Sequence, residues 1–281
     1  MRSGTVVRRR TVWMLYGSAT ILSLLWLVPF AAAVMIASLP IRQTRRGWWN
    51  FSFGQLTWAN FREAWSEGLS SYATNSLIIT GLAVSMTVVL GTLAAYAFAR
   101  MQFRLKRASY FLLITTMIVP VQIILVPLLP WFRSLGLTGS WKEYVGLALV
   151  HTAFGAGWAI FMMGSFFSDI PTEIIDAARV DGARPLTLFR RIALPLALPG
   201  IVSFAIIDFI FVWNDLLLAL TLLGRDRQPL TVGLANLSSP HLAQENLVAS
   251  GSIMAILPPM MLFAGLNRYY VRGLYAGATK G

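Results

Sequence analysis

Residues 72–99 read YATNSLIITGLAVSMTVVLGTLAAYAFA, a run without a single charged side chain. A helix rises 1.5 Å per residue, so about 20 apolar residues cross a hydrocarbon core of about 30 Å. The run therefore predicts a membrane-spanning helix. Runs of the same character recur along the chain, and we predict six spans, at 12–37, 72–99, 109–129, 144–167, 196–223 and 247–267.

The overall composition supports an all-α, polytopic membrane protein. Hydrophobic residues make up 57% of the chain and charged residues only 12%, less charge than a soluble domain of this length needs. The net charge of +12 could suggest nucleic-acid binding, but the basic residues lie in short segments between the apolar runs, where they face anionic lipid. We therefore expect membrane lipid as a partner and no nucleic acid. The absence of cysteine excludes disulfides, thiolate metal sites and cysteine nucleophiles.

The distribution of Lys and Arg predicts the orientation of the spans. Fifteen of the 23 basic residues lie in the N-terminal segment, the second and fourth connections and the C-terminal tail. By the positive-inside rule, both termini face the cytoplasm, as an even number of spans requires. The expected organisation is a basic cytoplasmic N-terminus at 1–11, a six-helix domain at 12–267 and a cytoplasmic tail at 268–281. The first run is too long for a cleaved signal peptide.

The fourth connection, 168–195, reads SDIPTEIIDAARVDGARPLTLFRRIALP and predicts a helical hairpin on the cytoplasmic side. Glu173 and Asp176 suit the start of a short helix, and Gly182 permits a sharp turn after it. A second helix at 185–193 follows, which Pro195 should stop before the fifth span. One face of this second helix should carry Leu186, Phe189 and Ile192. The pattern alone leaves two readings open, a hairpin resting on the membrane interface and a hairpin docking a partner.

The same connection resembles the EAA loop of the permeases of ATP-binding-cassette (ABC) importers. Asp176-Ala177-Ala178, then Gly182, then Ile192 to Pro195 follow the spacing of that loop, with Asp176 in place of the usual Glu. The resemblance implies that the hairpin docks in a groove of a separate ATP-hydrolysing subunit. The residues expected to couple the two subunits are Glu173, Asp176, Ala177, Ala178, Asp181, Gly182, Ala183, Phe189, Ile192, Leu194 and Pro195.

Asp181-Gly182-Ala183 together with Phe189 is similar to the form of the loop found in sugar importers. Further pieces resemble carbohydrate-type permeases in the expected order, and the tail GLYAGATKG at 273–281 resembles the second permease of maltose-type importers. The family implies a bacterial inner-membrane complex with a second homologous permease, two ATPase subunits that bind ATP and Mg, and an extracytoplasmic solute-binding protein. It implies no cofactor on this chain, and a sugar, polyol or glycerophosphodiester as solute.

Two carboxylates inside the predicted fifth span are candidates for the solute path. Asp208 and Asp215 are seven residues apart and should share a helix face, at a cost of at least about 2.5 kcal/mol for each ionised carboxylate in the bilayer. Trp213 and Asn214 lie beside Asp215 and could stack on and hydrogen-bond a sugar. The alternative is that neighbouring helices or a cap hold these Asp side chains. We interpret the lone His151 as structural and predict no metal site.

Enzymatic function is not expected. The chain contains no GxxxxGK[ST], HExxH or GxSxG motif. Asp208 and Asp215 would lie about 10 Å apart along one helix, too far to share a proton. The remaining alternative is a stand-alone secondary carrier or channel, but the two halves of the sequence show no clear repeat.

Overall fold

The computed structural model describes residues 9–49, 53–238 and 244–278, with the side chains of 9–10, 53 and 269–278 excepted. Most of the described residues are helical, and no strand occurs among them. The longer helices are α1 (Arg9–Ala37), α4 (Ser70–Arg100), α6 (Val121–Ser134), α7 (Lys142–Ser168), α10 (Leu194–Trp213) and α13 (Glu245–Ala278). The shorter ones are α2 (Ile41–Thr44), α3 (Ala59–Ala64), α5 (Lys106–Thr115), α8 (Thr172–Val180), α9 (Pro185–Leu188), α11 (Leu217–Leu222) and α12 (Leu230–Leu237). Residues 1–8, most of the predicted basic N-terminus, lie outside the described part, as do 279–281 at the end of the tail.

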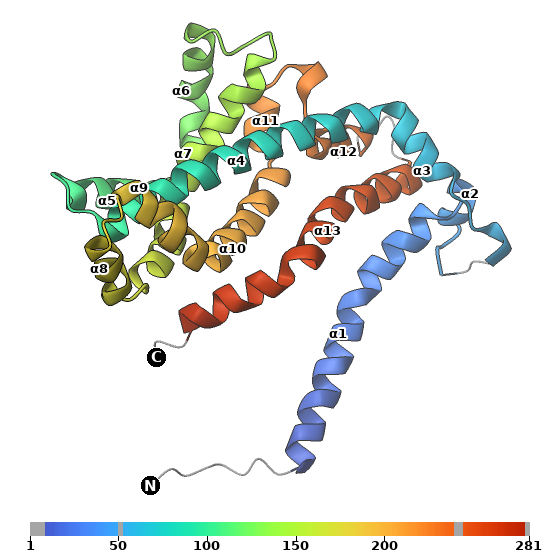
Figure 1. The fold of residues 1–281 in the computed structure, drawn as a ribbon. Coiled ribbons are helices and arrows are strands. Elements are labelled where there is room, and N and C mark those ends of the chain that lie inside the picture. Colours follow the sequence, from blue (N-terminus) through green and yellow to red (C-terminus); the bar gives the residue numbers. More distant parts are fainter. Residues whose placement is uncertain (1–8, 50–52, 239–243, 279–281) are drawn as a thin grey trace. The chain divides into compact units, whose positions relative to one another are not determined.

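The chain divides into two compact units. One comprises 1–68 and 236–254, and the other comprises 69–235 and 255–281. The larger unit is built on α4, α7 and α10, which pack against one another (Figure 1). One apolar cluster joins the beginnings of α4 and α7 to the end of α10, and a second joins the ends of α4 and α7 to the beginning of α10. Thus α4 and α7 run parallel, and α10 runs antiparallel to both.

Small residues allow α4 and α7 to approach closely. A Cβ placed on Gly91 of α4 would lie 2.4 Å from the Cβ of Ala159 on α7, well inside van der Waals contact. Such close backbone approach between small residues is typical of helix pairs in membranes, where dispersion contacts replace the hydrophobic effect.

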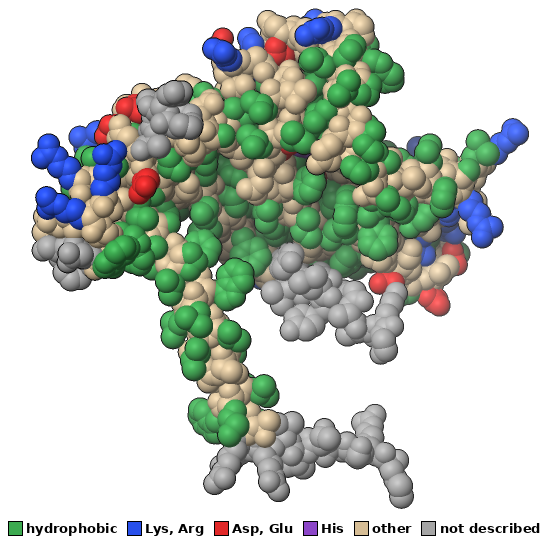
Figure 2. Space-filling view, turned by 180° about the vertical axis from the view of Figure 1, so that it is seen from behind, with side chains coloured by type: hydrophobic (Ala, Val, Ile, Leu, Met, Phe, Trp, Pro, Cys, Tyr) green, Lys and Arg blue, Asp and Glu red, His purple; other side chains and the backbone are tan. Residues whose placement is uncertain are grey.

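The smaller unit contains α1, which exposes large hydrophobic side chains along its length (Figure 2). Its most apolar window has no buried residue. The end of α1 is held by a buried polar joint: Asn60 Nδ2 donates to the carbonyls of Ala37 and Leu39, both at 2.8 Å. Asn246 Nδ2 in turn donates to Asn60 Oδ1 at 2.9 Å, and the Ser250 hydroxyl donates to Ala37 O at 3.2 Å. All the donors of this joint are side chains, so it depends on sequence rather than on backbone alone.

Five of the predicted spans correspond to helices long and apolar enough to cross a membrane. The third does not form one helix: it is broken between α5 and α6, where Pro120 removes a backbone donor and disfavours helical geometry in the residue before it. Leu113 O accepts both from the Thr116 hydroxyl at 2.6 Å and from the Thr116 amide at 3.2 Å, which closes the end of α5. The end of α5 packs on Gly157 of α7, whose added Cβ would meet Leu113 O at 2.5 Å.

Candidate functional site

The predicted hairpin is present, and its turn has a well-defined geometry. Helix α8 ends at Val180, and Gly182 adopts φ +81°, a left-handed conformation that favours glycine. The Ala183 amide donates to Ala178 O at 2.9 Å and the Gly182 amide to Arg179 O at 3.0 Å. These two bonds make a Schellman motif, which satisfies the last carbonyls of the helix. The sequence prediction of a turn at Gly182 is therefore confirmed.

One face of α8 and the turn is open to a partner. Asp176 is exposed and pairs with Arg179 at 3.0 Å, while Val180 is 88% exposed and Leu186 is 63% exposed. The predicted coupling residues Glu173, Ala177, Asp181 and Gly182 are exposed as well. An exposed face that mixes apolar side chains with a charge pair suits docking of a protein.

The second arm of the hairpin differs from the prediction in two ways. Leu186 does not share a face with Phe189 and Ile192: those two pack against the apolar cluster at the ends of α4 and α7, as does the buried Leu188. The five residues Phe189–Ala193 form a π-helical turn, η3, which is wider than the α-helix and shifts the side-chain positions. Pro195 does not stop the helix either. It follows the wider π-helical turn η3, and the helical stretch Pro185–Trp213 continues through it.

Aromatic rings fix the hairpin to the membrane helices. Phe189 lies 4.9 Å from the ring of Tyr96 on α4 and 6.4 Å from that of Phe167 on α7, and Tyr96 and Phe167 lie 5.5 Å apart. The three rings come from α4, α7 and the hairpin, so a single cluster joins all three elements. Ala183, Ile192 and Leu194 pack against the same cluster.

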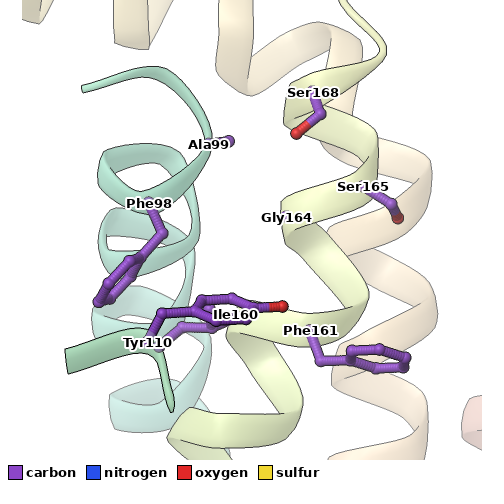
Figure 3. Close-up of a pocket in the computed structure, with 8 residues that line it drawn as sticks. All are labelled: Phe98, Ala99, Tyr110, Ile160, Phe161, Gly164, Ser165 and Ser168. Carbon is purple, nitrogen blue, oxygen red and sulfur yellow. The ribbon is translucent and has the colours of Figure 1, made fainter. Parts of the chain in front are cut away.

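Arg100, at the end of α4, adds a polar connection to the same place. Its Nε donates to Phe167 O at 2.7 Å, and its Nη2 donates to Ser168 O at 3.2 Å and to Ile170 O. These acceptors lie at the end of α7 and the start of the hairpin. Next to them, a pocket of about 310 Å³ separates the end of α4 from the last turns of α7 (Figure 3). It is lined by Phe98, Ala99, Tyr110, Ile160, Phe161, Gly164, Ser165 and Ser168.

A second group of polar side chains is buried between the membrane helices. Asp208 of α10 is 6% exposed, and its Oδ2 has no hydrogen-bond partner among the described residues. Gly155 of α7 leaves room for it, since an added Cβ there would lie 3.2 Å from Asp208 Oδ1 and 2.6 Å from Thr87 Cγ2. The hydroxyl of Thr87 donates to that of Thr152 at 3.3 Å. A carboxylate so deeply buried in a membrane protein marks a candidate functional position.

The predicted common helix face of Asp208 and Asp215 is not formed. α10 ends at Trp213, and Asp215 instead caps α11: its Oδ1 and Oδ2 accept from the amides of Leu218 at 3.3 Å and Ala219 at 3.0 Å. Asp215 Oδ2 also lies 3.6 Å from His151 Nε2. This pairing was not predicted from sequence, where His151 stood alone.

The two neighbours of Asp215 differ in exposure. Trp213 is 3% exposed; its ring stacks on Phe209 at 5.5 Å, and its Nε1 donates to Ala255 O at 3.0 Å. Its indole face is therefore covered by the protein rather than offered to a solute. Asn214 is exposed and donates to Ile210 O at 2.7 Å. Of the predicted path residues, Asn214 is the one most open to a passing molecule.

At the beginning of α7, Glu143 binds backbone amides of two segments that connect helices. This carboxylate is 3% exposed and accepts from the amides of Gly139 and, at 2.8 Å, Gly224. Asn75 of α4 donates to the carbonyls of Asp226 and Gln228 at 3.1 and 2.9 Å. The segment that follows α11 is thus held on the beginnings of α4 and α7.

Sequence reasoning missed Arg100, Thr87 and Thr152. Arg100 counted only as one basic residue of a connection, and a lone threonine in an apolar run gives no signal of its own. The position of Arg100 at the last residue of an apolar run was the available clue, because a cation there can reach carbonyls at the end of a neighbouring helix.

Comparison with known proteins agrees with the geometry. Residues 87–274 match the family described as binding-protein-dependent transport system inner membrane component. An osmoprotective compounds uptake permease of Synechocystis sp. is 35% identical, covering 92% of this chain and 89% of the relative. A melibiose/raffinose/stachyose import permease of Bacillus subtilis is 33% identical over the full length of both. In fold, a subunit of a bacterial alginate ABC transporter has a TM-score of 0.65 at 15% identity, over 92% of this chain and 94% of that one.

Proposed function

This chain belongs to the family of the binding-protein-dependent transport system inner membrane components, and we propose that its 168–195 hairpin couples it to a separate ATP-hydrolysing subunit. The family and the relatives make the chain a permease of the bacterial inner membrane and a transport protein rather than an enzyme. They favour this role over a stand-alone secondary carrier or channel.

The observation that carries the proposal is the geometry of the hairpin. Its first helix and turn expose a face with Asp176, Val180 and Gly182, while its second arm is fixed to the membrane helices through Phe189. A hairpin that is open on one side and anchored on the other can transmit closure of a docked partner to the helices behind it. Both termini and this hairpin then face the cytoplasm, as the distribution of basic residues indicates.

The proposed complex contains a second homologous permease, two ATPase subunits that bind ATP and Mg, and a solute-binding protein outside the cytoplasmic membrane. The family description itself names dependence on a binding protein. We propose that the binding protein docks on the segments 39–71 and 224–246, whose residues 50–52 and 239–243 lie outside the described part of the chain. The ordered anchoring of the second segment through Glu143 and Asn75 supports a docking role.

For the solute, we propose a sugar or a related polyhydroxylated compound. Two relatives are named for osmoprotective compounds and for melibiose, raffinose and stachyose. In this chain, the candidate path residues are the exposed Asn214 and the less exposed Asp208 and Asp215. Asn214 can exchange its bond to Ile210 O for bonds to solute hydroxyls. Trp213 supports this region by packing.

The test compares two glycine variants purified in mild detergent from the native membrane. Gly182→Trp strains the left-handed turn and places a bulky ring on the docking face, so we expect loss of the co-purifying ATPase. Gly136→Trp is the matched control, because Gly136 has φ +65° and open space around an added Cβ but lies outside the hairpin. We expect it to retain the ATPase. Full recovery of the ATPase with Gly182→Trp, or its absence from the wild-type preparation, would refute the proposal.

A further inference from the structure

We propose that Arg100 is a positioning residue that makes α4 move together with the 168–195 hairpin. The inference rests on the coupling role proposed above and adds to it a named connection between the hairpin and a helix that is not joined to it in sequence. Its consequence is that α4 follows the hairpin through a polar connection as well as through the ring contact of Tyr96 with Phe189.

The need for such a connection follows from the order of the chain. The hairpin continues directly from α7 and leads directly into α10, so peptide bonds carry its movement into both. By contrast, α4 ends at Arg100, far from the hairpin in sequence, and only non-covalent contacts can make it follow.

Arg100 makes the polar part of these contacts with one guanidinium group. It donates to the carbonyls of Phe167, Ser168 and Ile170, which surround the junction of α7 and the hairpin. The last carbonyls of a helix have no partner within the helix, and a cation beside them is favoured by the helix dipole. The guanidinium therefore satisfies exposed acceptors of α7 while it holds the end of α4 in place.

The apolar contacts between the ends of α4 and α7 lie on only one side of α4. Tyr96 packs on Phe167 and Phe189 on one side. On the other side lies the pocket of about 310 Å³ shown in Figure 3, and an added Cβ on Gly164 would find no atom within 4 Å. The end of α4 is thus in contact with α7 on one side and separated from it on the other, and Arg100 bridges the junction.

The geometry requires arginine rather than any cation. A guanidinium presents several N–H donors in a fixed plane, whereas an ammonium is a point charge on a flexible stem. The three carbonyls, of Phe167 and Ser168 at the end of α7 and of Ile170 just beyond it, suit the planar fork. Arg107, seven residues further along the chain, is exposed and provides a matched control of the same charge.

The experiment measures whether α4 and the hairpin move as one body. Because the chain has no cysteine, Leu93→Cys on α4 and Leu196→Cys at the start of α10, both exposed, can carry spin labels at two unique positions. The complex is purified with its partner subunits, and the distance between the labels is measured by electron paramagnetic resonance without nucleotide and after trapping with ATP and vanadate.

We expect the distance to stay constant on trapping, within about 2 Å, in the wild type and in Arg107→Gln. In Arg100→Gln it should change by several Å, while the ATPase still co-purifies. Arg100→Lys should lie between these two and carries the test if the glutamine variant does not accumulate. A constant distance in both Arg100 variants, or a change of several Å in the wild type itself, would overturn the inference. Absence of the ATPase from the wild-type preparation would instead refute the proposed function, so the two failures are distinguishable.

Discussion

The close approach of α4 and α7 at Gly91 allows a prediction with a stated magnitude. In Gly91→Ala, the new Cβ would lie 2.4 Å from that of Ala159, whereas ordinary contact begins at 3.4 Å. The two helices would have to separate locally by about 1 Å. Overpacking of this kind costs about 1–3 kcal/mol.

The matched control is Gly81→Ala in the same helix, where an added Cβ meets no atom within 4 Å. Both substitutions gain about 1 kcal/mol of helix propensity, so this contribution cancels when the two variants are compared. In thermal unfolding in one detergent, we expect Gly91→Ala to melt about 2–6 °C below Gly81→Ala.

The double variant Gly91→Ala/Ala159→Gly moves the methyl group from one helix to the other and should unfold close to the wild-type temperature. Equal melting of the two single variants would refute the reasoning from contact distance. A double variant that melts no higher than Gly91→Ala would show that the loss does not arise from this contact.

Two further predictions concern polar side chains that hold helix ends. Asp215→Ala removes the cap of α11 and should lower the free energy of unfolding by about 1 kcal/mol, measured by thermal unfolding, with Asp215→Asn in between. Asn60→Leu leaves Leu39 O without its side-chain donor and leaves Ala37 O with the Ser250 hydroxyl alone, at about 1–3 kcal/mol. It should speed tryptic cleavage after the exposed Arg45 in the same unit.

Each of these has a control on a neighbouring residue. Asn214→Ala removes one exposed hydrogen bond beside Asp215 and should change stability by less than about 0.5 kcal/mol. Glu63→Leu replaces an exposed side chain of α3 and should leave cleavage near the wild-type rate. A loss in Asn214→Ala as large as in Asp215→Ala, or equal cleavage in Asn60→Leu and wild type, would contradict the assigned roles.

The features that sequence predicts well here are local ones. The long spans follow from the lengths of apolar runs, and the turn at Gly182 follows from a glycine after a short helix with acidic residues at its start. The outcome at Pro120 and Pro195 differs because the effect of proline depends on position. Pro120 lies directly before α6, after α5 has ended at Thr115, whereas the helical stretch Pro185–Trp213 continues through Pro195.

The features that sequence does not predict are those made by side chains from different helices. His151 and Asp215 meet only because α10 stops at Trp213 and the chain turns into α11. Thr87 and Thr152 meet because α4 and α7 run parallel with small residues between them. No pattern within one span contains this information.

The continuity of the helical stretch Pro185–Trp213 makes it a lever arm. Its 29 residues extend over about 43 Å, so a tilt of about 5° at the hairpin would swing the far end by about 4 Å. The far end carries Trp213, which is fixed to Ala255 of α13, and just beyond it lie Asn214 and Asp215. A small rotation of the hairpin would thus produce a larger displacement of the residues proposed to meet the solute, because no loop interrupts the helical stretch between them.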